Sequence, residues 1–201
     1  NYVLSAGPVA TKADISARSL NATATGANKV YDQGTAASVT LGDDRVAGDV
    51  LSLAYGAANF TNKNVGNGKT INVSGISAAG TDSGNYVLAS ANATASGNIT
   101  PRTLVVGAQA SSKAYDGGRS ASASYTDDRL AGDQLSVSGN ASFADKNVGN
   151  GKSVTASGLS LSGTDAGNYA LAFNSVGTTA DITPRTLNVS VQGNKVYAGG
   201  T

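Results

Sequence analysis

The sequence contains no cysteine, histidine, methionine, tryptophan or glutamate, so that aspartate is its only acidic residue. These absences exclude disulfide bonds, thiol nucleophiles, imidazole bases and the cysteine and histidine ligands that zinc and iron prefer. Any chemistry would rest on Asp, Tyr, Lys, Ser or Thr. We therefore expect a protein that is not an enzyme and that carries no cofactor.

Charge of one sign and long hydrophobic runs are also scarce. Fourteen Lys and Arg residues face thirteen Asp residues, and the basic residues are scattered singly, as at Lys29, Arg45, Lys63 and Arg102. Phosphate binding needs a clustered basic patch, so we expect no nucleic-acid partner. No run approaches the roughly 18 apolar residues of a membrane span, and no targeting signal is visible, so we expect no membrane insertion by this fragment.

The residues that are abundant favour strands joined by turns. Gly occurs 26 times, and apolar and polar residues alternate in runs such as 50–53 and 70–73. An alternation with a period of two is the strand pattern, whereas Gly, Asn and Ser are turn residues. Asn67-Gly68 and Asn150-Gly151 stand just before alternating runs, which predicts tight hairpin turns there. We expect helix only as a turn or two near 43–48, near 80–85 and in their copies.

Comparison of the chain with itself reveals tandem repeats. Several motifs recur at an offset of 84 or 83 residues: Tyr31-Asp32 and Tyr115-Asp116, Asp43-Asp44-Arg45 and Asp127-Asp128-Arg129, 63–69 and 146–152, 84–86 and 167–169, and 99–102 and 182–185. The offset changes by one residue between Ala54 and Asn59, which predicts a loop there. The chain thus contains the end of a preceding repeat (1–17), two complete repeats (18–101 and 102–185) and the start of a following one (186–201).

Four spaced motifs resemble a known family. The Tyr-Asp-Gly triplet at 115–117 reads Tyr-Asp-Gln-Gly at 31–34 and is followed by Lys-Asn-Val-Gly, Gly-Thr-Asp-x-Gly-Asn-Tyr and a closing Ile-Thr-Pro. This order is similar to the YDG-type repeats of filamentous-haemagglutinin-like bacterial adhesins, which are exported by two-partner secretion, and to mucin-binding modules with a β-grasp-like fold. The last partial copy reads Tyr197-Ala198-Gly199 and lacks the acid.

The alternation and the resemblance together predict an all-β protein. We expect a tandem end-to-end array of small β-sandwich or β-grasp-like modules of about 83 residues, each with roughly five to seven short strands. The resemblance implies a secreted chain at the bacterial cell surface. There it would be a structural stalk of a large adhesin acting in cell-surface, cell-cell or biofilm-matrix adhesion.

An alternative function is that each repeat is itself a carbohydrate-binding module. Its partner would be an extracellular polysaccharide, a mucin-type glycan, or a glycan or protein on a host or neighbouring cell. The candidate contacts are Tyr31, Asp32, Tyr115 and Asp116, because an aromatic ring stacks on a sugar and a carboxylate accepts its hydroxyl protons. The structural interpretation is favoured, in which the tyrosine packs in the core and the Asp-Gly pair forms a turn.

Two acidic segments invite a calcium hypothesis, because hard cations bind several oxygen ligands at one place. The candidate ligands are Asp43, Asp44, Asp49, Asp127, Asp128 and Asp133. The alternating acidic loop of calcium-binding motifs is missing and Arg45 offers the carboxylates a partner, so a solvated turn is favoured. We expect calcium to be at most a minor stabiliser.

Two further patterns are weaker. Asp82 and Asp165 could lie at a ligand-facing tip, but a cap on a single helical turn is the favoured interpretation. Asn-x-Ser/Thr sequons begin at Asn21, Asn59, Asn72, Asn92, Asn98, Asn140 and Asn188. Their number barely exceeds what the abundance of Asn, Ser and Thr predicts by chance, so they carry no functional assignment.

Overall fold

A computed structural model describes Tyr2 and residues 11–193, and the chain divides into two compact units, residues 1–102 and 103–201. The secondary structure is 53% strand and 3% helix, which confirms the predicted all-β class. The sheets of each unit curl into a β-sandwich-like arrangement. No helix in the described part of the chain is long and apolar enough to cross a membrane.

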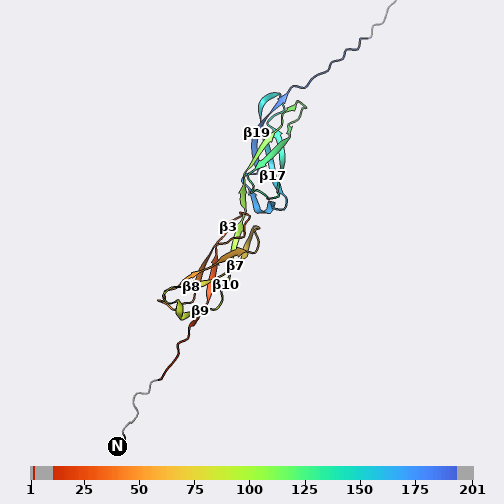
Figure 1. Cartoon of the computed structure of the whole chain (residues 1–201). Helices are drawn as coiled ribbons and strands as arrows, with labels where there is room; N and C mark the ends of the chain where they lie inside the picture. Colours follow the sequence, from red (N-terminus) through yellow and green to blue (C-terminus); the bar gives the residue numbers. More distant parts are fainter. Residues whose placement is uncertain (1, 3–10, 194–201) are drawn as a thin grey trace, which may run out of the picture. The chain divides into compact units, whose positions relative to one another are not determined.

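The first unit contains ten strands within the described residues. They are β1 (Arg18–Leu20), β2 (Ala22–Gly26), β3 (Lys29–Val30), β4 (Val39–Asp43), β5 (Ser52–Ala54), β6 (Ala57–Phe60), β7 (Gly66–Ser74), β8 (Ser77–Ala79), β9 (Tyr86–Leu88) and β10 (Asn92–Thr100). The largest sheet has the order β3-β10-β7-β6, and three two-stranded sheets pair β1 with β9, β2 with β4, and β5 with β8. Figure 1 labels β3, β7 and β10 of the largest sheet, together with β8 and β9.

The second unit repeats this plan with nine strands. They are β11 (Arg102–Leu104), β12 (Val106–Ala110), β13 (Lys113–Ala114), β14 (Ser120–Ala121), β15 (Ala123–Asp127), β16 (Ser136–Phe143), β17 (Gly149–Ser162), β18 (Tyr169–Leu171) and β19 (Ser175–Thr183). Its main sheet has the order β13-β19-β17-β16-β14. The long strands β17 and β19 are labelled in Figure 1. Both units exceed the predicted five to seven strands, because most strands are only two to five residues long.

The long strands have one apolar and one polar face. In β7, Ile71 and Val73 are buried while Asn72 and Ser74 are exposed. Successive side chains of a strand point to opposite sides of the sheet, so this period-two sequence places the apolar residues in the core. The polar residues form an outer face of the main sheet.

The core of each unit is small and is centred on the main sheet. Tyr31, Phe60, Ile71 and Ile99 are each at most 3% exposed in the first unit. In the second unit Phe143, Val154, Ala180 and Ile182 form the corresponding cluster, with Tyr115 packed against it. A second cluster, of Leu20, Leu51 and Tyr86, lies under the acidic loop of the first unit.

Parallel pairs occur near both ends of the first unit. β1 pairs with β9 in parallel, so that Arg18 lies opposite Tyr86, and β3 pairs with β10 in parallel, so that Lys29 lies opposite Ile99. In the second unit β13 and β19 form the same parallel pair. An early strand is thus bonded alongside a late strand in each unit.

The predicted helical turns are only partly correct. A 3-10 turn at Ser83–Asn85 (η1) and its copy at Ala166–Asn168 (η2) occupy the second predicted position. The segment 43–48 forms no helix: Asp43 ends β4 and a non-helical turn follows. The reason is that the Asp43 side chain accepts a hydrogen bond from the Arg45 amide, two residues ahead, which favours a local turn over helix.

The Asn-Gly pairs were predicted to be hairpin turns, and that prediction is wrong. Asn67 and Gly68 lie within β7, at the point where its register with β10 shifts between Gly97 and Ile99. Gly68 has φ of 59° and donates its N–H to the Asn98 side chain at 2.7 Å. The positive φ of Gly68 therefore forms a β-bulge and not a turn. Gly151 (φ 57°) forms the same bulge in the second unit and donates its N–H to the Asp181 side chain.

The predicted loop at the one-residue offset exists in the first unit alone. Tyr55 and Gly56 interrupt the chain between β5 and β6, whereas the equivalent residues of the second unit run through β16 as one strand. There a single residue, Gly139, lies where the register shifts between Ser138 and Asn140. The extra residue of the first unit thus converts a strand with a bulge into two strands.

Candidate functional site

The acidic loop of the first unit is organised around Arg45. Its Nε donates to Asp43 Oδ1 at 2.7 Å, one Nη donates to Asp43 Oδ2, and the other donates to the carbonyl of Leu51. The Asp43 side chain is 2% exposed. The hydrogen bonds from Arg45 lower the pKa of Asp43 below its ordinary value, and the carboxylate is committed to this internal pair.

The second unit repeats the pair with equivalent residues. Arg129 donates to both carboxylate oxygens of Asp127 and to the carbonyl of Leu135. Its hydrogen bonds likewise lower the pKa of Asp127. The same arrangement in both copies shows that the Asp-Asp-Arg motif specifies a loop conformation.

In each unit a tyrosine hydroxyl forms two hydrogen bonds with the acidic loop. The Tyr86 hydroxyl donates to Asp49 Oδ2 at 2.5 Å and accepts the Val46 N–H at 2.9 Å. The hydrogen bond to Asp49 raises the pKa of Tyr86. Tyr169 repeats both contacts in the second unit, with Asp133 at 2.6 Å and with the Leu130 N–H at 3.0 Å. The Gly-Asn-Tyr motif is thereby joined to the acidic motif.

The remaining acidic residues of these motifs also accept internal hydrogen bonds. Asp44 accepts from the backbone and side-chain amides of Asn21, and Asp128 accepts the Val105 N–H at 2.8 Å. Asp82 accepts the Val50 N–H at 2.8 Å, and Asp165 accepts that of Gln134 at 2.9 Å. Asp82 and Asp165 occupy the N-cap positions of η1 and η2, but their side chains make no capping hydrogen bond, because loop amides distant in sequence take their carboxylates.

These bonds bear on the calcium hypothesis. Each of the six candidate ligands is engaged inside its own unit: Asp43 and Asp127 by arginine, Asp49 and Asp133 by tyrosine, and Asp44 and Asp128 by amides of the chain. No group of three or more acidic residues in the described ranges is placed to hold a metal ion. That calcium is at most a minor stabiliser stays a prediction.

The two candidate glycan-contact tyrosines face inward. Tyr31 is 1% exposed, so its ring cannot stack on a sugar, and the glycan contact proposed for it is wrong. The Tyr115 ring is partly buried and packs against the core cluster that contains Phe143. Both tyrosine rings pack in or against the core, because each small module has few large apolar residues with which to fill it.

Asp32 and Asp116 belong to a lysine-centred turn. Lys29 Nζ lies 2.7 Å from Asp32 and donates to the carbonyls of Gly34 and Ala36. The hydrogen bond from Lys29 lowers the pKa of Asp32. In the second unit Lys113 lies 2.9 Å from Asp116 and lowers its pKa in the same way. Both carboxylates are more than half exposed, but their charge is already paired.

Sequence reasoning overlooked the two lysines. Lys29 Nζ lies 5.9 Å from the centre of the Phe60 ring, and Lys113 Nζ lies 5.5 Å from that of Phe143, so each ammonium joins the turn to the core. A signal was present, because a lysine precedes the motif tyrosine by two residues in every copy, including Lys195 before Tyr197. The Tyr-Asp-Gly motif is therefore a folding motif in this chain.

Comparison with known proteins agrees with the repeated geometry. The model of the YDG domain family matches the chain twice, at residues 16–95 and 100–180. The comparisons with curated proteins and with solved structures found no match. The two matches cover most of the chain and each contains the full set of lysine, arginine and tyrosine contacts described above, so this chain belongs to the YDG domain family.

Proposed function

We propose that this chain is a load-bearing spacer in the repeat region of a large extracellular bacterial adhesin exported by two-partner secretion. Its role is mechanical and not catalytic: the repeats hold an adhesive tip away from the cell or join neighbouring cells in a matrix. Tandem repeats suit this role because each added module lengthens the chain with the same local contacts. The membership in the YDG family and the resemblance of the four motifs to adhesin repeats support the proposal.

The observation that carries the proposal is the parallel pairing of early and late strands. In the first unit the first strand, β1, runs parallel to the late strand β9, and β3 runs parallel to the last strand, β10. Opposite pulls on the two ends of the unit would therefore load both parallel pairs in shear, so that the paired strands slide past one another. The hydrogen bonds of such a pair must break together, whereas an antiparallel hairpin pulled at its open end breaks them one at a time.

The internal polar networks support the same role. In each unit an arginine, a tyrosine and a lysine tie three loops to the strands, through Arg45, Tyr86 and Lys29 in the first unit. These bonds restrain loops in a domain that has no disulfide. A secreted spacer could then withstand load without cysteines, and an unfolded chain without thiols cannot mispair during export.

Single-molecule force spectroscopy tests the proposal. The whole chain is tethered first by its two ends and then, as a control, through cysteines introduced at Ser136 and Ser162. These exposed residues lie opposite each other at the open end of the β16–β17 pair, so the control load peels that pair. The chain contains no other cysteine to compete for attachment.

We expect the second unit to unfold at a force several-fold higher when it is pulled by its ends than when it is peeled. Forced unfolding depends on the unfolding barrier. The difference between the two unfolding forces therefore reports the direction in which the load is applied and not the free energy of unfolding. Equal forces in the two geometries, or a lower force for the ends, would remove the physical basis of a load-bearing spacer.

A further inference from the structure

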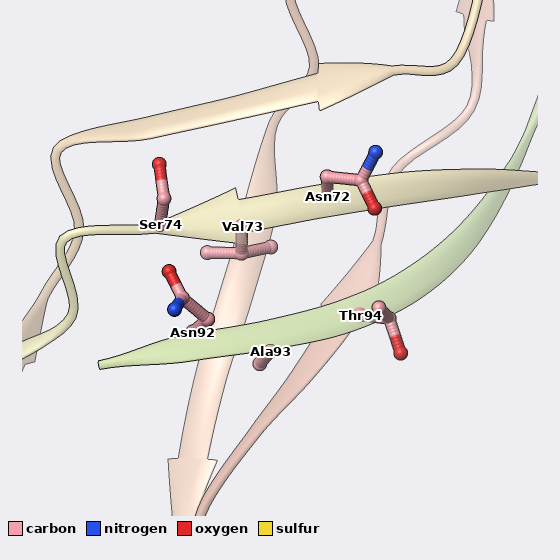
Figure 2. A pocket seen from close by; sticks show the side chains of 6 residues that line it. All are labelled: Asn72, Val73, Ser74, Asn92, Ala93 and Thr94. Atoms are coloured by element: carbon pink, nitrogen blue, oxygen red, sulfur yellow. The ribbon is translucent and has the colours of Figure 1, made fainter. Parts of the chain in front are cut away.

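The outer face of the first unit's main sheet carries a group of uncommitted hydrogen-bonding side chains. Asn72 and Ser74 project from β7, and Asn92 and Thr94 from β10, and all four are exposed. Figure 2 shows them on the two adjacent strands. The register places Asn72 opposite Thr94 and Ser74 opposite Asn92, so each row pairs one amide with one hydroxyl. We call these four residues the amide face.

The amide face surrounds a shallow hollow. A depression of about 470 Å³ is lined by the four polar residues together with Val73 and Ala93. Figure 2 labels all six residues on β7 and β10. Concave sites with a few convergent polar groups are where small ligands bind. On the outer face of the first unit's main sheet, this hollow is therefore our candidate ligand site.

The four side chains differ from the motif residues in being free to bind. Within the described residues the carboxylates and cations of the repeated motifs are occupied by internal bonds, as shown above. In the same described ranges the side chains of the amide face make no hydrogen bond to the protein, and the structure attributes no further interaction to them. Each amide offers two donors and an acceptor, and each hydroxyl offers both kinds of group.

The surroundings of the amide face define the chemistry of its ligand. The neighbouring outward positions, Asn59 on β6, Thr70 on β7 and Ser96 on β10, are also uncharged. A charged ligand would find no counter-ion there, whereas the hydroxyl groups of a neutral ligand would find both amide and hydroxyl partners. No aromatic ring lines the hollow, so stacking adds nothing to the affinity.

We propose that the amide face of the first repeat binds a neutral oligosaccharide, a segment of an uncharged extracellular polysaccharide. Asn72 and Asn92 make the principal hydrogen bonds to sugar hydroxyls, and Ser74 and Thr94 complete them. This site is separate from the glycan contacts predicted at Tyr31 and Tyr115. It does not depend on the load-bearing role, so either proposal can fail without the other.

The second unit provides a natural contrast. The equivalent positions are Thr155 and Ser157 on β17 and Ser175 and Gly177 on β19, in the same register. Both amides are missing, and one hydroxyl is replaced by glycine. We therefore expect the first repeat to bind and the second repeat not to bind, although both have the same fold.

Nuclear magnetic resonance titration of the whole chain tests the assignment. The probes are cellohexaose, hexa-N-acetylchitohexaose and maltohexaose as neutral ligands and hexagalacturonate as an acidic one. The readout is the side-chain NH₂ signals of Asn72 and Asn92, which report directly on the proposed contacts. Both residues begin sequons, so the sample is first shown by intact mass to carry no covalent sugar.

We expect at least one neutral probe to shift these signals, with a dissociation constant of about 1 mM, as suits a shallow site with few neutral hydrogen bonds. Shifts centred on other residues, shifts with hexagalacturonate alone, or no shift with any probe at about 10 mM would overturn the proposal.

Three variants complete the test. Asn72→Ala with Asn92→Ala should weaken binding at least tenfold, read from the backbone amide signals of β7 and β10 because this variant lacks both NH₂ groups. Thr155→Ala with Ser175→Ala, at the equivalent positions of the second repeat, should leave binding unchanged. The triple substitution Thr155→Asn, Ser175→Asn, Gly177→Thr should create a second site. A Cβ at Gly177 would meet no atom within 4 Å, so the position has room for the start of a side chain. Unchanged binding in the first variant, or no new site in the third, would contradict the role of the four side chains.

Discussion

At the scale of single residues, each acidic loop depends on one buried hydroxyl. Asp133 is 5% exposed and Tyr169 is 6% exposed, so that neither can be satisfied by bulk water. The Tyr169 hydroxyl both donates to Asp133 and accepts the Leu130 N–H. A buried charge that loses a partner retains its desolvation cost, and the bond is therefore worth more than an ordinary surface hydrogen bond.

Replacing that hydroxyl gives the first prediction. Tyr169→Phe should lower the free energy of unfolding of the second unit by about 2 kcal/mol, because the ring still fits but the buried Asp133 carboxylate loses the hydrogen bond from the Tyr169 hydroxyl. Native-state hydrogen exchange at Val154 and Ile182, both buried in that unit, measures the change.

Tyr125→Phe is the matched control for this substitution. The Tyr125 hydroxyl is buried without a hydrogen-bond partner among the described residues, so its removal should cost nothing or stabilise slightly. A loss of similar size in both variants would show that the polar bond at Tyr169 contributes nothing specific.

The second prediction concerns acid stability. Arg45 and Arg129 lower the pKa values of Asp43 and Asp127 below the ordinary value of 3.8, which the unfolded chain retains. The stability from these pairs is then fully present above about pH 4 and is lost as the pH falls through the lower folded-state pKa values.

Thermal unfolding between about pH 6 and about pH 2 measures this effect. As the pH decreases below about 4, the melting temperature should decrease. In the double variant Arg45→Gln, Arg129→Gln this decrease should be smaller, because the two arginine pairs are gone. It should not vanish, because other paired carboxylates such as Asp32 and Asp145 keep their lowered pKa values. Identical slopes in the two proteins would contradict this account of the arginine pairs.

At the scale of elements, the turn after the motif tyrosine shows how the two copies differ. In the second unit Gly117 adopts φ of 83°, and in the first unit Gln33 takes the same place with φ of 69°. The turn is otherwise the same, because Asp32 accepts the Gly34 N–H and Asp116 accepts the Gly118 N–H. An L-residue other than glycine is strained in the left-handed region.

Exchanging the two residues is the third prediction. Gln33→Gly should raise the free energy of unfolding of the first unit by up to about 1 kcal/mol, and Gly117→Gln should lower that of the second by a similar amount. A Cβ at Gly117 would meet no atom within 4 Å, so we attribute the expected loss to backbone strain at a positive φ. Denaturant unfolding measures both changes.

Gln109→Gly in β12 controls for the flexibility that glycine adds to the unfolded chain. Gln109 has no positive φ to relieve, so this substitution should destabilise the protein. The strain argument fails if Gln33→Gly destabilises the first unit as much as Gln109→Gly destabilises the second.

At the scale of the whole molecule, the boundary between the repeats is short. β10 ends at Thr100 and β11 begins at Arg102, so one residue, Pro101, separates the two strands. Proline fixes its own φ and restricts the residue before it. This short junction is the reason for the expectation, made from the sequence, that the array is stiff.

The fourth prediction follows from that boundary. Small-angle scattering of the two-repeat chain should fit a single elongated particle with restricted bending. Inserting Gly-Ser-Gly-Ser before Pro101 should broaden the distribution of sizes toward that of a freely jointed pair. A compact globule, or a wild-type chain as flexible as the insertion variant, would contradict the expected stiffness of the proposed stalk.

The sequence by itself determined the repeat, the all-β class and the inward face of the long strands, because a period of two in polarity is a local property. It could not place the aspartates. Asp49 meets a tyrosine 37 residues away and Asp44 an asparagine 23 residues away. Asn67-Gly68 shows the same limit. The sequence predicts a positive φ at Gly68. The pairing with β10, through the Asn98 side chain, determines that this φ forms a β-bulge and not a hairpin turn.

The amide face was likewise decided by tertiary structure. Asn72 and Asn92 stand 20 residues apart in the sequence, and nothing local distinguishes them from the other sequon asparagines. The antiparallel register of β7 and β10 brings each amide opposite a hydroxyl of the other strand. Strand pairing joins residues distant in the chain, and a pattern that reports only which side of a strand a residue occupies contains no information about that partner.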